Sequence, residues 1–239
     1  PFASVVAQEA VEARGSDFRS KPAGTGPFKL AWWEENVAIV LHRNEGYWER
    51  DEHGIQLPYL EAVHIDFVPD MGSEYLGLIQ GRYDFMSGLH PAYMEDLMDL
   101  DGGLAEKHKA DLSLRRIPFL KTDYIGLLVD DNILLGSPFL DGRVRQALSL
   151  SIDRISIARN LRRNSVLPSD KFVPPSLPGA TAYATPIYDL ARAKSLLNDA
   201  GYPNGEGFPE FEFGTTSDYV DICAAIQHGW QALGLKVQI

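Results

Sequence analysis

The 239-residue sequence predicts an α/β fold divided into two lobes, and two observations support this prediction. Strand-like patterns dominate the first ~125 residues, whereas helix and strand patterns alternate over the last ~100 residues. The change falls near residues 130–137, so we expect the lobe boundary there. The composition, with 45% hydrophobic and 23% charged residues, is ordinary for a globular chain.

The first half combines two short helix patterns with a series of strand patterns. Apolar residues at helical spacing predict a helix over residues 4–14, which Gly15 ends. Ser73 is expected to cap a second helix that closes at Gly81. Period-two alternation or short apolar runs predict strands at residues 28–32, 37–41, 63–67, 83–87, 112–118 and 122–130.

Residues 137–163 read SPFLDGRVRQALSLSIDRISIARNLRR and contain six arginines in a chain of net charge -11. Asp141 is a plausible N-cap for one long helix, and the arginines fall mostly on its polar face. We expect that face to be solvated, with Arg159, Arg162 and Arg163 near the negative end of the helix dipole. The apolar stripe of this helix consists of Val144, Ala147, Leu148, Ile152, Ile155, Ala158 and Leu161.

The last third predicts a strand–helix–strand unit. Asp189 is expected to cap the helix LARAKSLLNDA, and FEFGTT has a strand pattern. Asp218 is expected to open the next helix, with Asp221 three residues on. Because LKVQI is again strand-like, the order predicts a βαβ unit with parallel strands.

Several classes of function lack support in the sequence. The isoelectric point near 5.0 argues against nucleic-acid binding. No two of the six histidines lie three or four residues apart, so no helix presents a histidine pair to a metal. No G-x-S-x-G motif is present, and GTGPFK lacks the third glycine of a dinucleotide loop. Cys223 is the only cysteine, which excludes an internal disulfide and favours a buried apolar role. We therefore predict no catalytic residues, no metal and no cofactor.

Five segments, in this order, resemble the extracellular solute-binding proteins of the oligopeptide, dipeptide and nickel class that serve ABC importers. The first is KPAGTGPFKLAWWEENVAIVLHRNEGYW, in which Gly24 to Pro27 form the turn and Arg43, Asn44, Tyr47 and Trp48 follow the second strand. The others are FVPDMGSEYLGLIQGRYDFM, SPFLDGRVRQALSLSIDR, YDLARAKSLLNDAGYPNG and IQHGWQALGLKVQI.

The resemblance implies a periplasmic-binding-protein-like α/β fold, with two lobes that close on a ligand. Residues 1–130 would then be the middle portion of lobe one and residues 131–239 the first half of lobe two, so that both lobes are incomplete. The implied function is capture of a peptide, oligosaccharide or chelated nickel, and delivery to a membrane permease, without chemistry. The implied location is periplasmic or extracellular, with a lipid anchor as one arrangement. We expect such a fragment to associate with itself, because incomplete lobes leave strand edges uncovered.

Two stretches are candidates for ligand binding. The first follows the strand pattern that contains Asp84, since ligands of α/β lobes tend to lie at strand ends. The second opens the presumed hinge strand, where an acidic side chain could meet an ammonium group. These candidates are Ser87, Gly88, Leu89 and His90, followed by Asp123 and Tyr124.

Two other classes of function remain open on the sequence alone. The same module, fused to a DNA-binding domain, would act as the ligand sensor of a transcriptional regulator. A hydrolase that uses two carboxylates, for example two of Asp66, Asp70 and Asp84, is the other alternative.

Overall fold

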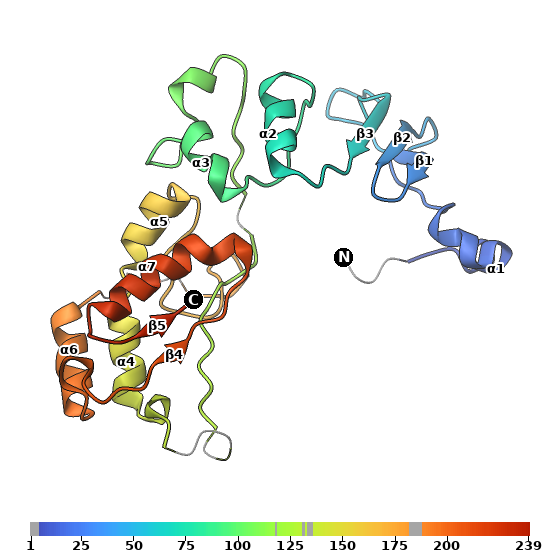
Figure 1. The fold of residues 1–239 in the computed structure, drawn as a ribbon. Helices are drawn as coiled ribbons and strands as arrows, with labels where there is room; N and C mark the ends of the chain where they lie inside the picture. Colours follow the sequence, from blue (N-terminus) through green and yellow to red (C-terminus); the bar gives the residue numbers. More distant parts are fainter. Residues whose placement is uncertain (1–4, 118, 131, 133–135, 182–187) are drawn as a thin grey trace. The chain divides into compact units, whose positions relative to one another are not determined.

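The computed structural model describes residues 5–117, 119–130, 132, 136–181 and 188–239 (Figure 1). The chain divides into two compact units, Pro1–Ser87 and Gly88–Ile239. The lobe boundary predicted near residue 130 concerns the hinge of a two-lobed protein and stays a prediction. Each unit is described by itself below.

The first unit is built on an antiparallel sheet of three sequential strands. Its order is β1-β2-β3, with a register shift between Leu30 and Trp32 in the β1–β2 pair. The three predicted strands of this region are therefore confirmed. The elements are α1 (Gln8–Arg14), η1 (Gly15–Arg19), β1 (Phe28–Glu34), β2 (Ala38–Arg43), β3 (Ala62–Asp66) and α2 (Met71–Ile79).

Asn44 explains why the glycine-rich turn and the end of β2 occur together in the sequence. Its side chain donates to the Gly26 carbonyl at 2.9 Å and accepts from the Gly46 backbone at 3.1 Å. Its backbone N–H donates to the Pro27 carbonyl at 2.8 Å. Buried polar groups need such partners, so this nearly buried asparagine ties the two ends of the hairpin together.

The cap of α2 differs from the prediction. Asp70, not Ser73, is the N-cap, and its carboxylate accepts a hydrogen bond from the Ser73 backbone at 2.7 Å. A hydrogen bond from the Ser73 side chain is the largest cause of the lowered pKa of Asp70, and this backbone bond is the second. An aspartate three residues upstream satisfies the N3 donor, so Ser73 lies inside the first turn.

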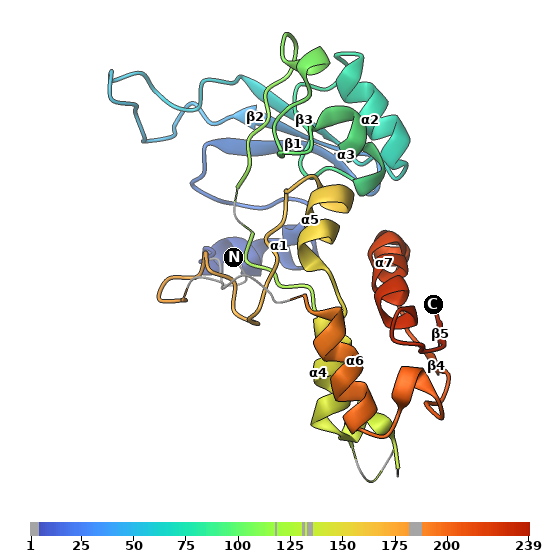
Figure 2. The same cartoon turned by 90° about the vertical axis from the view of Figure 1, so that its left-hand side faces the viewer.

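The second unit is mainly helical, with one small parallel sheet. Helices α4 and α6 lie side by side in both views (Figures 1 and 2). Strand β4 pairs in parallel with β5, and α7 connects them, which confirms the predicted βαβ unit. The helices and strands are α3 (Pro91–Leu97), α4 (Gly142–Leu150), α5 (Arg154–Arg162), α6 (Leu190–Asp199), β4 (Phe211–Glu212), α7 (Val220–Gln231) and β5 (Val237–Gln238). Short 3-10 turns lie at η2 (Glu106–His108), η3 (Pro138–Leu140), η4 (Pro203–Gly205) and η5 (Ser217–Tyr219).

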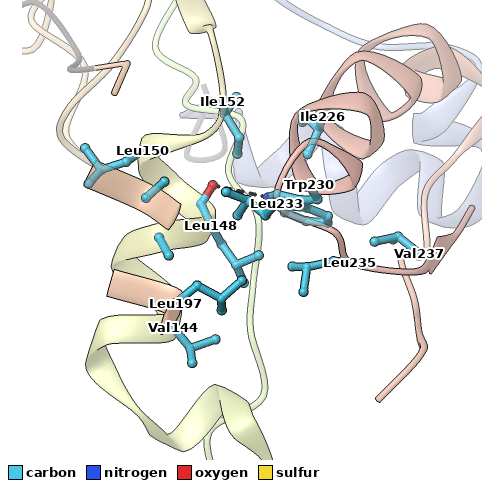
Figure 3. Close-up of a cluster of buried hydrophobic side chains, with 12 residues drawn as sticks. Val144, Leu148, Leu150, Ile152, Leu197, Ile226, Trp230, Leu233, Leu235 and Val237 are labelled. Carbon is cyan, nitrogen blue, oxygen red and sulfur yellow. Dashed lines mark hydrogen bonds between the residues drawn. The ribbon is translucent and has the colours of Figure 1, made fainter. Parts of the chain in front are cut away.

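One hydrophobic core joins α4, α6, α7 and β5 (Figure 3). Trp230 is its largest fully buried side chain, and its indole N–H donates to the Leu148 carbonyl at 3.1 Å. An indole N–H in a core needs a partner, so this bond also fixes the distance between α7 and α4. The buried members are Val144, Ala147, Leu148, Leu150, Ile152, Ala193, Leu197, Ile226, Trp230, Leu233, Leu235 and Val237.

The predicted single helix over residues 141–163 is wrong, because two helices occupy that stretch. Asp141 caps α4 as expected, through the Arg143 backbone N–H at 2.7 Å. The chain then breaks, and Asp153 caps α5 through the Ser156 N–H at 3.0 Å. A second internal aspartate that bonds to a backbone donor three residues on starts a new helix rather than continuing the first.

The predicted solvated arginine face is also wrong at Arg162. This residue is only 5% exposed, and its guanidinium donates to both carboxylate oxygens of Asp221, at 2.5 and 3.0 Å. The predicted capping role of Asp218 fails as well, since α7 begins after Tyr219 without a side-chain cap. Asp221 instead joins the first turn of α7 to the last turn of α5.

Three predicted strands are not formed in the described part of the chain. Residues 83–87, 112–117 and 122–130 lie outside any strand or bridge, and Pro118 of the second prediction lies outside the described residues. Alternation alone does not make a strand, because each strand needs a neighbour to complete its hydrogen-bond ladder. The described residues supply no such neighbour to these stretches.

Candidate ligand-binding site

Residues 119–130 form an extended segment that passes the core of the second unit, visible as a yellow-green trace without an arrow in Figure 1. Ile125 and Leu127 pack against the hydrophobic core. Tyr124 and Leu128, which alternate with them, are 69% and 53% exposed. Over residues 124–128 the segment therefore has an inner face and an outer face, as in a strand.

Asp123 is two residues before Ile125 in the segment. Its side chain connects the segment to Tyr219, the residue before α7. Its Oδ1 atom lies 2.9 Å from the Lys121 ammonium and accepts a hydrogen bond from the Tyr219 hydroxyl at 3.2 Å. Lys121 also donates to the Tyr219 hydroxyl at 2.5 Å, which is the largest cause of its raised pKa. The Lys121 ammonium lies 5.3 Å from the centre of the Tyr219 ring. Asp123 thus has two partners within the chain and links the segment to Tyr219.

Tyr124 points to the exposed side of the segment and contacts the aromatic ring of Phe172, which lies far away in the sequence. Its ring packs edge-on against Phe172, with 5.0 Å between centroids and 61° between planes. Both side chains remain largely exposed, at 69% and 65%. Exposed rings of this kind offer a large contact area with few rotatable bonds. Tyr124 is therefore the predicted site residue that is best placed to contact a ligand.

Thr122 adds an unusual polar atom to the segment. Its Oγ1 is buried and has no hydrogen-bond partner among the described residues. Leaving a buried hydroxyl without a partner costs free energy, and such atoms are rare in native proteins. Thr122 has the parity of Tyr124, but the burial of its hydroxyl shows that the alternation of inner and outer side chains does not extend to this residue.

The other predicted group, residues 87–90, has a different local structure. Ser87 ends the first unit and Gly88 begins the second, where Gly88 has φ 87°. Leu89 is half-buried. His90 is the N-cap of α3, and its Nδ1 accepts from the Ala92 backbone at 3.3 Å.

Through its hydrogen bond and ring contact, His90 contacts residues of its own helix, α3, and none of the described residues of the extended segment. An Nδ1 acceptor places the proton of the neutral imidazole on Nε2. The ring also lies 6.2 Å from that of Tyr93. Across the described residues, no hydrogen bond or ring contact brings His90 to Asp123 or Tyr124. A role for residues 87–90 in ligand binding stays a prediction.

Sequence reasoning missed Phe172, Tyr219 and Lys121. Phe172 lies in a loop whose sequence has no helical or strand periodicity. Tyr219 was overlooked because the cap of the following helix was predicted at Asp218. The ion pair between Lys121 and Asp123 could have been predicted, because residues two apart in an extended chain lie on the same side. The meeting of these side chains depends on tertiary structure and leaves no local signal.

A separate hollow of about 440 Å³ lies in the first unit. Its lining includes Arg14, Lys21, Trp32 and Trp33. The cations already have partners, since Arg14 donates to the Lys21 carbonyl and Lys21 lies 3.0 Å from Asp17. This hollow is therefore the weaker candidate for a charged ligand.

The described residues also lack a metal site and a membrane-spanning helix. They contain no group of three or more His, Cys, Asp or Glu side chains that could hold a metal ion. Among the same residues, no helix has the length and apolar character that crossing a membrane requires.

The fold and the whole sequence identify the class of protein. Residues 1–239 match the family described as bacterial extracellular solute-binding proteins, family 5 Middle. The chain belongs to this family, which confirms the resemblance and the α/β fold class inferred from the sequence. The family's name also places its members outside the cell, which is the coarser part of the predicted location.

Individual relatives refine this picture. The glutathione-binding protein GsiB of Salmonella paratyphi A is 27% identical over 239 residues, covering 100% of this chain and 43% of GsiB. The periplasmic binding protein DppA of Helicobacter pylori, solved with the peptide STSA, has TM-score 0.62 and 25% identity, covering 99% of this chain and 43% of DppA. The substrate-binding protein CtaP of Listeria monocytogenes has TM-score 0.68 and covers 98% of this chain and 45% of CtaP, but at 19% identity it shows the fold alone. The chain thus spans less than half the length of these relatives.

Proposed function

We propose that this chain is part of the solute-binding component of an ABC importer. In this proposal, two lobes close over a peptide or a related small solute, and the loaded protein delivers it to the membrane permease. The observation that carries the proposal is the family match, which extends over all 239 residues. Ligand would stabilise the closed state through contacts to both lobes, without any covalent step.

The ligand class follows from the relatives. GsiB is named for glutathione, which is itself a peptide, and DppA was solved with the peptide STSA. Both relatives are binding proteins rather than enzymes, which supports the prediction that this chain has no catalytic residues. Peptides are therefore the first ligands to test, ahead of oligosaccharides and chelated nickel.

The proposal assigns different roles to Asp123 and Tyr124. Tyr124, exposed and in contact with Phe172, would touch the ligand, whereas Asp123 would position the segment through Lys121 and Tyr219. Residues 87–90 would form part of the cleft rim. Residues 1–130 and 131–239 would belong to different lobes.

The finer points of location and assembly also belong to the proposal. A solute-binding protein of this family would act in the periplasm or at the outer cell surface, where a lipid anchor would hold it near its permease. No nucleic acid takes part. The 239-residue chain produced alone would associate with itself through its exposed apolar side chains.

A thermal-shift screen tests the function. The protein should be produced from its complete gene and mixed with di- to pentapeptides, glutathione, oligosaccharides and nickel with chelators. A ligand present at 100 times its dissociation constant adds about 2.7 kcal/mol to the free energy of unfolding. We expect a shift with peptides, and we expect Tyr124→Ala to reduce it. A well-folded protein that responds to no member of the panel contradicts the proposal.

A further inference from the structure

Gly126 is an open position on the outer face of the extended segment. A Cβ atom built there would meet no described atom within 4 Å, and the residue does not have a positive φ. The backbone therefore does not require glycine at this position. Gly126 instead leaves a gap in a row of side chains.

The width of the gap follows from strand geometry. Tyr124 and Leu128 flank Gly126 on the same parity, and an extended chain rises about 3.3 Å per residue. Their Cα atoms are therefore about 13 Å apart, with no side chain between them on that face. An aromatic ring fits in a gap of this size.

The residues around the gap define the group that it would accept. The Tyr124–Phe172 pair forms an aromatic wall on one side, and Leu128 forms an aliphatic wall on the other. None of these side chains is charged, because Lys121 and Asp123 have the opposite parity and bind Tyr219.

We infer that Gly126 is a specificity-determining residue, whose missing side chain opens a subsite for an aromatic or large apolar side chain of the ligand. The inference rests on the proposed function. Ring-on-ring contact with the Tyr124–Phe172 pair and burial against Leu128 would stabilise that group. A peptide with small side chains would leave the subsite unfilled.

The test compares two tripeptides, Ala-Phe-Ala and Ala-Ala-Ala, by isothermal titration calorimetry on the protein from its complete gene. The Gly126→Val variant adds a side chain to the gap, and valine suits an extended backbone. Gly214→Val is the matched control, since a Cβ at Gly214 also meets nothing within 4 Å and lies after β4. Thermal unfolding of both variants checks that each one folds like the wild type.

We expect the wild type to bind Ala-Phe-Ala at least about tenfold more tightly than Ala-Ala-Ala, in line with pocket discrimination by apolar groups. Gly126→Val should abolish this preference while Gly214→Val preserves it. Equal binding of both peptides to the wild type, or a preference that survives Gly126→Val, overturns the inference and leaves the proposed function standing. A wild type that binds neither tripeptide nor any other panel ligand refutes the proposed function, and the inference with it.

Discussion

At the scale of single residues, the contact between Arg162 and Asp221 is the most demanding polar interaction in the second unit. The guanidinium is almost fully buried, whereas the Asp221 side chain is 42% exposed. Water can therefore solvate Asp221 if Arg162 is removed, but it cannot easily reach Arg162 if Asp221 is removed. This asymmetry leads to two predictions.

The first prediction compares truncation of the two partners. Asp221→Ala should lower the free energy of unfolding by about 2–4 kcal/mol, because it leaves a buried charge without a partner. Arg162→Met should cost less, about 1–2 kcal/mol, because the apolar chain keeps the packing and the remaining carboxylate is partly solvated. Urea unfolding measures both values, with Asp218→Ala, in η5 just before α7, as the control. Equal costs for the two variants would contradict the asymmetry.

The second prediction concerns pH. Hydrogen bonds from Arg162 are the largest cause of the lowered pKa of Asp221, whose ordinary value is 3.8. A carboxyl whose folded pKa is depressed contributes stability that is fully present above the unfolded pKa and is lost as the pH falls through the folded pKa. The free energy of unfolding should therefore fall below about pH 4, and Asp221→Ala should reduce the slope. An identical slope in wild type and variant between pH 5 and pH 2 would exclude this contribution.

At the scale of elements, α7 passes close to the break between α4 and α5. A Cβ built on Gly229 of α7 would lie 2.4 Å from the Ser151 carbonyl oxygen, which is backbone and cannot rotate away. A residue without a side chain is therefore needed at position 229 for α7 to pack against the break. This close approach also brings Trp230 to its bond with Leu148.

We therefore predict that Gly229→Ala lowers the free energy of unfolding by about 1–3 kcal/mol, in spite of the better helix propensity of alanine. Gly214→Ala serves as the control, and it should be neutral or slightly stabilising because the position is open. Chemical denaturation distinguishes the two. A stabilised Gly229→Ala protein would show that α7 can move away from the break at little cost.

The elements also show what sequence reasoning can and cannot supply. The sheet of the first unit, the caps at Asp141 and Asp189 and the βαβ unit were all predictable, because each depends on local periodicity or on a residue beside its own helix. The break at Asp153 was missed because the apolar stripe continues across it. The burial of Arg162 was missed because its partner is 59 residues away in sequence.

In the candidate site, too, some features could be predicted from the sequence and others depend on tertiary structure. Asp123 and Tyr124 were singled out as neighbours in the sequence, yet alternation places them on opposite faces of one segment. Parity in an extended chain could have separated their roles in advance. The meeting of Tyr124 with Phe172 could not be foreseen, since no pattern in the loop around Phe172 indicates where it goes.

At the scale of the whole molecule, many large apolar side chains of the described residues are exposed. Phe85, Ile117 and Phe119 are each more than 70% exposed. Large exposed apolar surfaces mark contact sites or association. The chain also spans less than half of its relatives, so the rest of such a protein would be the natural cover.

We therefore predict that the 239-residue chain produced alone associates with itself at micromolar concentration. Sedimentation velocity over a tenfold range of concentration measures this, with the protein from its complete gene as the comparison. The complete protein should remain a monomer while the shorter chain forms larger species. A shorter chain that sediments as a monomer throughout would contradict the prediction.

The two-faced extended segment has a consequence for how such proteins diversify. Ile125 and Leu127 pack against the core, whereas Tyr124 and Leu128 are largely exposed and a Cβ at Gly126 would meet no described atom within 4 Å. Under the proposed function, substitutions at Tyr124, Gly126 and Leu128 would change ligand contacts at little cost in folding stability, so related proteins could acquire new ligands on one scaffold. A library at position 126 should yield mostly folded proteins with altered ligand preferences, and a library at position 125 should yield mostly unfolded ones.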